Sequence, residues 1–454
     1  MRWRAQAVAD AVGGARRGPD VDVTGVTVDS RRVGGGELFV PVRAARDGHD
    51  FIGAAVDAGA AAYLTEREPP AARGTAIVVR DTLAALADLG RAARRRLPDR
   101  VVGVTGSAGK TSTKDLLAAA LGPAFRTTAS ERSFNNELGV PLTLANAPDG
   151  TEVAVVELGA RGPGHIRQLC ELARPTIGVV TNVGLAHTEM LGSLEGVAAA
   201  KSELVAALPP SGWAVLNADD ERVAAMAAAT AAQVLTFGVT KGEVRATGLV
   251  LDDELRPTFR LVSPWGEAEV RLEARGAHHA ANAAAAAAAA LAAGAPLEKV
   301  VDGLARAGLS PWRMELRRAA GGGVVLNDAY NANPSSTAAA LRALAALPAS
   351  RRVAVLGPML ELGEHSRPEH RRMGDLARDL GVDRLITVGA PDYGGEDVSD
   401  LDEAAALVGT VGPGDAVLVK GSRAAGLERL AAGLVGDDDR RPGTRTAARE
   451  AAAW

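Results

Sequence analysis

Residues 101–115, VVGVTGSAGKTSTKD, place a glycine-rich turn and a Lys-Thr pair between an apolar strand and a helix. The segment contains the glycines Gly103, Gly106 and Gly109. We expect it to bind a polyphosphate, because glycines let the backbone approach the anion and the amides at a helix N-terminus point at it. In that arrangement Lys110 reaches the outer phosphates and the hydroxyl of Thr111 ligates Mg²⁺.

The segment departs from the strict P-loop spacing, which requires a glycine at the position of Val104. The alternative is an ordinary strand, turn and helix that carries a surface lysine. The order of strand, loop, Lys-Thr pair and helix favours the phosphate loop.

Three further polar residues follow apolar runs of the same region or lie near them. Glu157 ends the run EVAVVEL, at the sheet edge where the phosphate loop lies, and this position suits a metal-binding carboxylate. His187 follows TNVGLA, but a lone histidine is more often structural than a ligand. Lys201, in AAAKSEL, is by its pattern a solvated helix lysine. The pattern alone therefore favours a function only for Glu157.

A second polar group begins the last third of the chain. Arg313 lies in PWRMEL, and Asp328 lies in the turn-rich run NDAYNANP directly after an apolar strand. Such a loop places hydrogen-bonding groups at the carboxyl edge of a strand, where a cleft between domains would form. Loops of this kind are more often functional than decorative.

Composition bounds the class of protein. The 454 residues suffice for two to four domains, and the 51 basic and 55 acidic residues nearly balance, so no global field favours nucleic acid or an anionic membrane. The single cysteine, Cys170, excludes an intrachain disulfide and a cysteine-based zinc cluster. Asp10 interrupts the start before an apolar leader develops, and no run of about 18 strongly apolar residues occurs. We expect a soluble, cytoplasmic protein without membrane insertion.

The order of apolar runs predicts an α/β protein of three domains with a tail. Near-continuous apolar strands alternate with helices after Val101 and again after Pro311, which predicts two doubly wound parallel sheets covered on both faces. Residues 244–274 alternate apolar and polar positions, which predicts antiparallel hairpins, and an alanine-rich helix follows from about His278. The predicted units are residues 1–98, 99–310 and 311–435, and a tail at 436–454 that we expect to be disordered.

Several segments in order along the chain resemble the Mur ligases of peptidoglycan synthesis. They are VDSRR, DGHDF, TGSAGKTSTKD, RSFNNELGVPLTL, ELGARGPGHI, NVGLAHTEMLGSLEGVAAAKSEL, HHAANAAAA, RMEL, NDAYNANPSS, MLELGEHS and LVKGSR. Within the family, FNNELGVPLTL, RGPGHI and DAYNANP are characteristic of the member that joins D-alanyl-D-alanine to UDP-N-acetylmuramoyl-tripeptide. The resemblance implies a first domain that binds the uridine diphosphate, a central P-loop ATPase domain and a Rossmann-like C-terminal domain.

The resemblance also implies roles for individual residues. Thr111 and Glu157 would hold one Mg²⁺, and His187 and Lys201 would serve a second, with Lys201 carbamylated. This reverses the interpretation of His187 and Lys201 from pattern alone, because a carbamate supplies the oxygen ligands that Mg²⁺ prefers, whereas an ammonium repels the ion. Arg313 would reach the γ-phosphate of ATP.

Other residues match the nucleotide and substrate segments of the family. The nucleotide set is Gly106, Ser107, Gly109, Lys110, Thr111, Ser112, Asn282, Arg313 and Asp328, with Asn282 on adenine, as part of an H-x-x-x-N element begun by His278, and Asp328 on the ribose. The substrate set is Ser30, Arg31, Asp47, Gly48, His49, Asn135, Asn136, Asn331 and Asn333. One departure is Pro358 in LGPMLELGE, where the family usually has aspartate. Any role of that acid in the family therefore does not carry over to this position, and proline removes an amide donor from the loop.

The implied reaction starts with attack of the tripeptide carboxylate on the γ-phosphate of ATP. The acyl phosphate formed is then displaced by the amine of D-alanyl-D-alanine, and two Mg²⁺ ions, Lys110 and Arg313 shield the approaching anions. The alternatives are a ligase of the same superfamily that adds another amino acid, a folylpolyglutamate synthase, or a P-loop switch or motor. The absence of a basic face and of a Walker-B aspartate argues against the motor. A monomer is the expected state.

Overall fold

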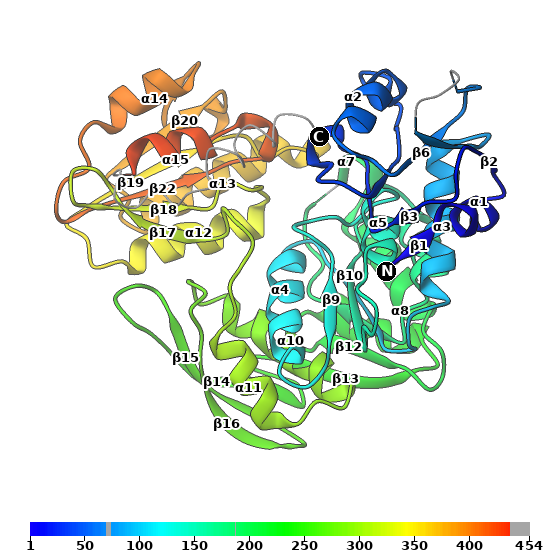
Figure 1. The fold of residues 1–454 in the computed structure, drawn as a ribbon. Coiled ribbons are helices and arrows are strands. Elements are labelled where there is room, and N and C mark those ends of the chain that lie inside the picture. The colour runs from blue at the N-terminus through cyan, green and yellow to red at the C-terminus, as the bar shows by residue number, and fades with distance from the viewer. Residues whose placement is uncertain (70–73, 187, 436–454) are drawn as a thin grey trace.

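The computed structural model describes residues 1–69, 74–186 and 188–435 and shows an α/β protein of three domains (Figure 1). Each domain is built around its own sheet. His187 and the predicted tail at 436–454 lie outside the described residues. No helix in the described ranges has both the length and the apolar character needed to span a bilayer.

The first domain contains a five-stranded sheet and a separate two-stranded pair. In order across the sheet, the strands are β2 (Ala15–Arg17), β7 (Thr75–Val78), β6 (Ala62–Thr65), β5 (Glu37–Phe39) and β4 (Gly25–Thr27). Only β2 runs antiparallel to its neighbour. The accompanying elements are β1 (Trp3–Arg4), β3 (Asp22–Val23), α1 (Ala5–Ala11), α2 (Ile52–Asp57) and α3 (Thr82–Arg94).

A buried arginine ties this domain to the next. Arg94, at the end of α3, donates from Nε to the carbonyl of Ala173 over 2.7 Å and from its other nitrogens to the carbonyls of Leu97, Pro98 and Arg174. Burial is the main cause that lowers the pKa of Arg94. The guanidinium therefore fixes α3 against the C-terminal end of a central-domain helix, where carbonyl groups lack partners within the helix.

The central sheet has nine strands, most of them parallel. In order, they are β16 (Gly266–Arg271), β15 (Pro257–Ser263), β14 (Val244–Leu251), β13 (Gln233–Gly238), β12 (Trp213–Asn217), β11 (Ile177–Val180), β8 (Val101–Thr105), β10 (Val153–Glu157) and β9 (Thr127–Ala129). The seven neighbouring strands that lie between β9 at one edge of the sheet and β14, these two included, are parallel. The strands β14, β15 and β16 form the predicted antiparallel hairpins.

Helices cover both faces of this sheet, as the continuous apolar runs predict. Alternate residues of β10 enter different cores: Ala154 and Val156 join the one shared with the first domain, and Val153 and Val155 join the one under the alanine-rich helix. The helices are α4 (Lys110–Leu121), α5 (Gly139–Ala145), α6 (His165–Ala173), α7 (Thr188–Leu191), α8 (Leu194–Ala206), α9 (Glu221–Ala225), α10 (His279–Ala292) and α11 (Leu297–Ala305). α10 confirms the predicted alanine-rich helix, and its small side chains allow close packing on α4.

The C-terminal sheet has six strands, and only β17 runs antiparallel to its neighbour. In order, they are β17 (Glu315–Arg318), β18 (Val324–Asn327), β22 (Asp415–Lys420), β19 (Arg351–Leu356), β20 (Arg384–Val388) and β21 (Glu396–Val398). Separate cores on the two faces contain residues of α12 (Pro334–Ala346) and α13 (Ser366–Asp379), and of α14 (Leu401–Val408) and α15 (Glu428–Leu434). This is the predicted doubly wound arrangement.

Candidate active site

A cavity of about 1490 Å³ is lined by residues of all three domains. Asp29 and Arg32 come from the first domain, and Lys110 comes from the central domain. Arg313 and Asp328 come from the C-terminal part of the chain. Asp29, Lys110 and Asp328 follow the carboxyl ends of β4, β8 and β18, where α/β proteins bind ligands.

The predicted phosphate loop lies between β8 and α4. Gly106 has a φ of +152°, and a Cβ atom there would overlap the hydroxyl of Thr181. Gly109 has a φ of +79°, and a Cβ atom there would lie 2.7 Å from the side-chain oxygen of Asn282. Both positions require glycine, because φ is positive there and a Cβ atom would meet a neighbouring side chain. Gly103 was wrongly assigned to the loop: it lies inside β8, where a Cβ atom would come within 3.0 Å of Leu158 and Leu204.

The strand-end segment after β11 braces this loop. The Oδ1 atom of Asn182 accepts from the amide of Ala108 over 2.8 Å, and its carbonyl accepts from the amide of Ser107 over 3.0 Å. The Ser107 hydroxyl donates to the Gly184 carbonyl and accepts from the Gly184 amide, each over 2.9 Å. The sequence did not predict a role for Asn182, because its contact with the loop depends on β11 lying beside β8 in the sheet.

Two cations and a hydroxyl meet beside the loop. The Nζ atom of Lys110 donates to the carbonyl of Gly106 over 2.8 Å. Arg313 donates from NH2 to the Oγ1 atom of Thr111 over 2.8 Å, and its guanidinium stacks 4.1 Å from the ring centre of Tyr330. The Nε–H of Arg313 is buried without a partner among the described residues. This donor fits a phosphoryl oxygen, the hydrogen-bond partner that guanidinium groups commonly hold.

The charges near Lys110 shift its pKa in opposite directions. Burial lowers the pKa of Lys110; Glu157 opposes the shift, Arg313 adds to it and Glu361 opposes it. An anion next to Lys110 therefore favours the charged lysine.

Glu157 has the chemistry of a metal ligand. It lies at the end of β10 and is 1% exposed. Its Oε1 atom accepts from Asn135 over 2.8 Å, whereas Oε2 is buried without a hydrogen-bond partner among the described residues. An unpartnered buried carboxylate oxygen is costly, and a hard cation such as Mg²⁺ would satisfy it. Within the described residues no group of three histidine, cysteine or acidic side chains could hold a metal on its own.

Lys201 lies in α8 and is 1% exposed, so the expectation of a solvated surface lysine from pattern alone was wrong. Burial lowers its pKa well below the ordinary value, and the charge of Lys110 lowers it further. This shift favours the neutral amine, which is the form that reacts with carbon dioxide. His187, its predicted companion, lies outside the described residues.

The start of α10, where the family resemblance predicts the adenine of ATP, lies at the cavity. His278, His279 and Asn282 all line it. The two histidine rings lie 4.0 Å apart, and Asn282 Nδ2 lies 3.2 Å from Nδ1 of His279. Burial lowers the pKa of His278 to about 4; Asp328 opposes this shift and Lys420 adds to it. Both rings are thus neutral, since burial also lowers the pKa of His279 well below its usual value.

Asp328 is held rigidly at the end of β18. Its Oδ1 atom accepts from the amide of Met314 over 3.1 Å, and its Oδ2 atom lies 2.5 Å from Nζ of Lys420. Lys420 also donates to the carbonyl of Asn331 over 2.9 Å and is 1% exposed. The segment LVKGSR contains this lysine, but its ion pair could not be predicted from the sequence, because it depends on β22 lying beside β18.

Several predicted polar residues serve the backbone as well as the cavity. Asn333 caps α12, accepting from the Ser336 amide over 2.9 Å, and its Nδ2 atom donates to the carbonyl of Ser107 over 3.3 Å. Asn136 accepts from the amide of Gly139 at the start of α5 over 2.9 Å. Asn135, Asn136, Asn331 and Asn333 all line the cavity. Ser112 also lines it, from the first turn of α4.

The first-domain candidates lie outside the cavity wall. Among the described residues that line the cavity, Asp29 and Arg32 occur, but Ser30, Arg31, Asp47, Gly48 and His49 do not. Arg31 instead forms an ion pair with Asp29 over 2.7 Å, and this contact is the main cause that lowers the pKa of Asp29.

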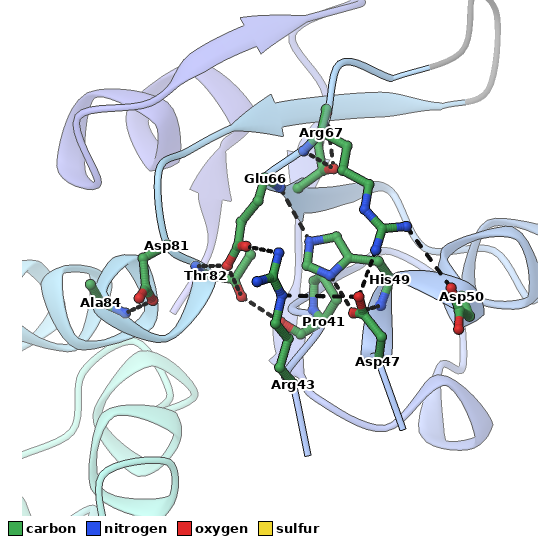
Figure 2. Close-up of polar contacts among 11 residues, drawn as sticks. Pro41, Arg43, Asp47, His49, Asp50, Glu66, Arg67, Asp81, Thr82 and Ala84 are labelled. Atoms are coloured by element: carbon green, nitrogen blue, oxygen red, sulfur yellow. Dashed lines mark hydrogen bonds and ion pairs between the residues drawn. The ribbon is translucent and has the colours of Figure 1, made fainter. Parts of the chain in front are cut away.

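Figure 2 shows Asp47 and His49 pointing toward each other inside a polar network of the first domain. Nδ1 of His49 lies 2.7 Å from Asp47 Oδ1, and Nε2 accepts from the Glu66 amide over 3.2 Å. The other carboxylate oxygen of Asp47 pairs with Arg67 over 2.6 Å. A Cβ atom at Gly48 would lie 2.5 Å from the amide nitrogen of Val42. Both ring nitrogens of His49 therefore bind protein groups.

The loop that carries Pro358 follows β19. The carbonyl of Pro358 accepts from the amide of Ser422 over 3.0 Å, and the next amide, that of Met359, donates to Nε2 of His370 over 2.9 Å. The loop is thus held through the carbonyl of Pro358, a group that proline retains although it lacks an amide N–H.

Known proteins resemble this chain over nearly its full length. Three sequence models of one family match: "Mur ligase family, catalytic domain" at 22–94, "Mur ligase middle domain" at 104–290 and "Mur ligase, glutamate ligase domain" at 312–423. The UDP-N-acetylmuramoyl-tripeptide–D-alanyl-D-alanine ligase of Mycobacterium tuberculosis is 42% identical, over 92% of this chain and 93% of its own. The Escherichia coli protein of the same name is 35% identical, over 94% and 97%.

Solved structures agree. A crystal structure of MurF from Acinetobacter baumannii is 33% identical and superimposes with a TM-score of 0.85, covering 96% of this chain and 99% of that one. MurF from Thermotoga maritima in complex with ADP is 29% identical, with a TM-score of 0.78 over 90% and 96%. The phosphate loop, the interdomain cavity and these similarities lead to one conclusion: the chain belongs to the Mur ligase family.

Proposed function

We propose that this protein is an ATP-dependent ligase that joins D-alanyl-D-alanine to UDP-N-acetylmuramoyl-tripeptide. The observation that carries the proposal is the contact of Arg313 with Thr111, which brings a cation of the C-terminal domain to the phosphate loop inside a cavity shared by three domains. The substrate identity rests on the names of relatives that match along more than nine-tenths of the chain.

The chemistry requires activation of a carboxylate. A carboxylate does not acylate an amine, because its oxide is a poor leaving group, so the tripeptide carboxylate first attacks the γ-phosphorus of ATP and ADP departs. The amine of D-alanyl-D-alanine then attacks the acyl carbon, and the C–O bond to phosphate breaks. Lys110 and the Nε–H of Arg313 stabilise the charge of the transferred phosphoryl group, which is the main contribution of protein groups in such transfers.

The unpartnered oxygen of Glu157 and the hydroxyl of Thr111 fit one Mg²⁺ ion, and His187 with Lys201 would hold a second. Bound Mg²⁺ neutralises phosphate charge and orients the oxygens. For Lys201 to serve as a ligand its amine must become a carbamate, and the lowered pKa of this lysine supplies the neutral amine that the modification needs.

The remaining assignments come from the family resemblance, and the cavity lining supports those of Asn282 and Asp328. Asn282 and Asp328 bind the adenine and ribose of ATP, with Lys420 fixing the carboxylate. We propose that the uridine diphosphate lies against residues 29–32 of the first domain, of which Asp29 and Arg32 line the cavity. We further propose domain limits near residues 98 and 310, a monomer, and action in the cytoplasm.

Phosphate release identifies the reaction. The protein is supplied with ATP, Mg²⁺, UDP-muramyl-tripeptide containing either lysine or diaminopimelate, and a panel of amino acids that includes D-alanyl-D-alanine. We expect phosphate release only when a tripeptide and D-alanyl-D-alanine are both present. Turnover without either peptide would indicate a motor. In a parallel reaction a folate and glutamate replace the two peptides, and phosphate release there would indicate a folylpolyglutamate synthase. With ¹⁸O in the tripeptide carboxylate, one label must appear in orthophosphate; its absence excludes an acyl phosphate.

A further inference from the structure

Arg423 of the C-terminal domain lines the cavity, and the assignments above give it no role. It ends the segment LVKGSR and begins the short 3₁₀ turn Arg423–Ala425 between β22 and α15. Its side chain is 30% exposed. The guanidinium therefore belongs to the cavity wall and is partly accessible there.

Two side chains hold the guanidinium of Arg423. Its NH1 atom forms an ion pair with Oε2 of Glu428 over 2.8 Å, and the side chain of this acid is only 7% exposed. The guanidinium also lies 4.6 Å from the ring centre of Trp312. Both Glu428 and Trp312 line the cavity. A guanidinium that stacks on an indole and pairs with a buried carboxylate has little freedom to lose when it binds a ligand.

Arg423 lies near the proposed site of phosphoryl transfer. Burial is the main cause that raises the pKa of Tyr330. The charge of Arg313 opposes this shift, that of Glu157 adds to it and that of Arg423 opposes it. Arg313 itself stacks on the ring of Tyr330, at 4.1 Å, and reaches the phosphate loop. The charge of Arg423 thus acts in the same part of the cavity, while its own ion pair is with Glu428 and not with a residue of the phosphate loop.

The segment around Arg423 carries an excess of positive charge. Arg423 and Arg429 supply two cations and Glu428 supplies one acid, and all three line the cavity. Arg429 donates to the carbonyl of Gly426 over 3.4 Å and forms no ion pair with an acid of the described residues. One further anion would balance the charge here. Arg423 can bind it beside Glu428, because a guanidinium has five N–H donors in a planar fork.

The proposed acceptor brings such an anion. D-Alanyl-D-alanine has an amine at one end, which attacks the acyl carbon, and a carboxylate at the other end, which takes no part in the chemistry. Two residues of extended chain span about 7 Å, so the carboxylate lies away from the reacting amine. A guanidinium recognises a carboxylate through two parallel hydrogen bonds, and a ligand fixed at one end presents its other end in a defined direction.

We propose that Arg423 binds the carboxylate of the incoming acceptor dipeptide, with Glu428 and Trp312 holding the guanidinium in place. This inference rests on the proposed ligase function. The contact directs the amine toward the acyl carbon and makes the site prefer an acceptor that ends in a free carboxylate. No covalent bond to Arg423 forms or breaks, so the two steps of the ligation keep the balance given above.

The test crosses one substitution with one change in the acceptor. The two acceptors are D-alanyl-D-alanine and its C-terminal amide, which keeps the amine but lacks the negative charge. We expect the wild-type protein to prefer the free carboxylate by about 100-fold in kcat/KM, since hydrogen bonds between charged groups are strong. In Arg423→Met, kcat/KM for the dipeptide should fall about 100-fold, mainly through KM, and that for the amide should stay within about 3-fold of wild type.

Two further variants accompany this test. Arg367→Met is the matched control, because Arg367 lies on α13 of the same domain, is 74% exposed at its side chain and is not among the cavity-lining residues. We expect it to leave both rates unchanged. Arg423→Lys keeps the charge but lacks the planar fork, so a preference of about 10-fold for the free carboxylate should remain. This variant provides the same comparison if the methionine variant does not fold.

The possible outcomes are distinct. Equal losses with the two acceptors overturn the proposal, because Arg423 would then act on ATP, on the tripeptide or on folding. An unchanged rate of Arg423→Met with the dipeptide also overturns it. If Arg429→Met removes the preference for the free carboxylate and Arg423→Met retains it, the carboxylate binds the neighbouring arginine and the assignment is wrong. A wild-type protein that releases no phosphate with either acceptor is not this ligase, and that failure is seen before any variant is compared.

Discussion

Arg313 donates a hydrogen bond to the Oγ1 atom of Thr111 over 2.8 Å, although the two residues lie 202 positions apart and in different domains. The bond places a guanidinium beside the phosphate loop, with one further buried donor, Nε–H, directed at no protein group in the described chain. The C-terminal domain therefore contributes a cation to the proposed phosphate site.

Arg313→Lys should keep the charge and lose most of the activity. The lysine lacks the planar fork that bonds Thr111 and a phosphoryl oxygen together, so we expect kcat to fall about 100-fold and Arg313→Ala to fall further. Steady-state release of ADP measures the effect. The control is Arg342→Lys, on the exposed side of α12, which should behave as wild type. If Arg313→Lys has a normal kcat, Arg313 does not take part in the phosphoryl transfer.

Lys201→Ala should abolish ligation, and acetate or propionate should restore part of it. The reason is that a short carboxylate replaces the carbamate oxygens in the space left by the buried side chain, which is 1% exposed. The assay is phosphate release with and without the added acid. Lys299→Ala, an exposed lysine of α11, is the control. Full activity of untreated Lys201→Ala would contradict a carbamate ligand.

The sequence predicted the elements better than the contacts between them. Gly106, Gly109 and the Lys-Thr pair were predictable, because strand, loop and helix are adjacent in the chain. The burial of Lys201 could not be predicted from the sequence of its helix, because which face of α8 is buried depends on the strands that pack against this helix. Lys420 meets Asp328 only because β22 inserts between β18 and β19, a crossover that local pattern does not encode.

Acidification should destabilise the protein through His278. Its folded pKa of about 4 lies below the ordinary value of 6.5, so the unfolded chain binds more protons and the free energy of unfolding rises with pH. The contribution is full above about pH 6.5 and falls as the pH approaches 4, by about 3 kcal/mol in total. Urea unfolding of wild type and His278→Gln at several pH values measures it. The variant should show a shallower decline below about pH 6.5; an equally steep decline would exclude His278 as a cause.

Arg94→Met should lower the free energy of unfolding by about 3 kcal/mol, because four carbonyl acceptors lose a charged donor and stay buried. Arg91→Met on the same helix α3 is the matched control. Its ion pair with Asp88 is about half exposed on each side, so we expect a change below about 0.5 kcal/mol. Equal effects of the two substitutions would show that the contact between domains does not depend on the buried guanidinium.

The bonds that cross from the C-terminal to the central domain predict a compact state favoured by ligands. Arg313 meets Thr111, Leu362 meets Thr188, and Tyr330 meets Ser133 through their hydroxyls. An acyl phosphate is hydrolysed by water, so the domains must close before it forms, and phosphate bridging Lys110 and Arg313 adds attraction between them. We expect X-ray scattering to give a larger radius of gyration for the free protein than with a non-hydrolysable ATP analogue and UDP-muramyl-tripeptide. An identical radius in both states would mean that closure is not coupled to binding. The Nε–H of Arg313 would then lie beside the phosphate loop before the ligands bind.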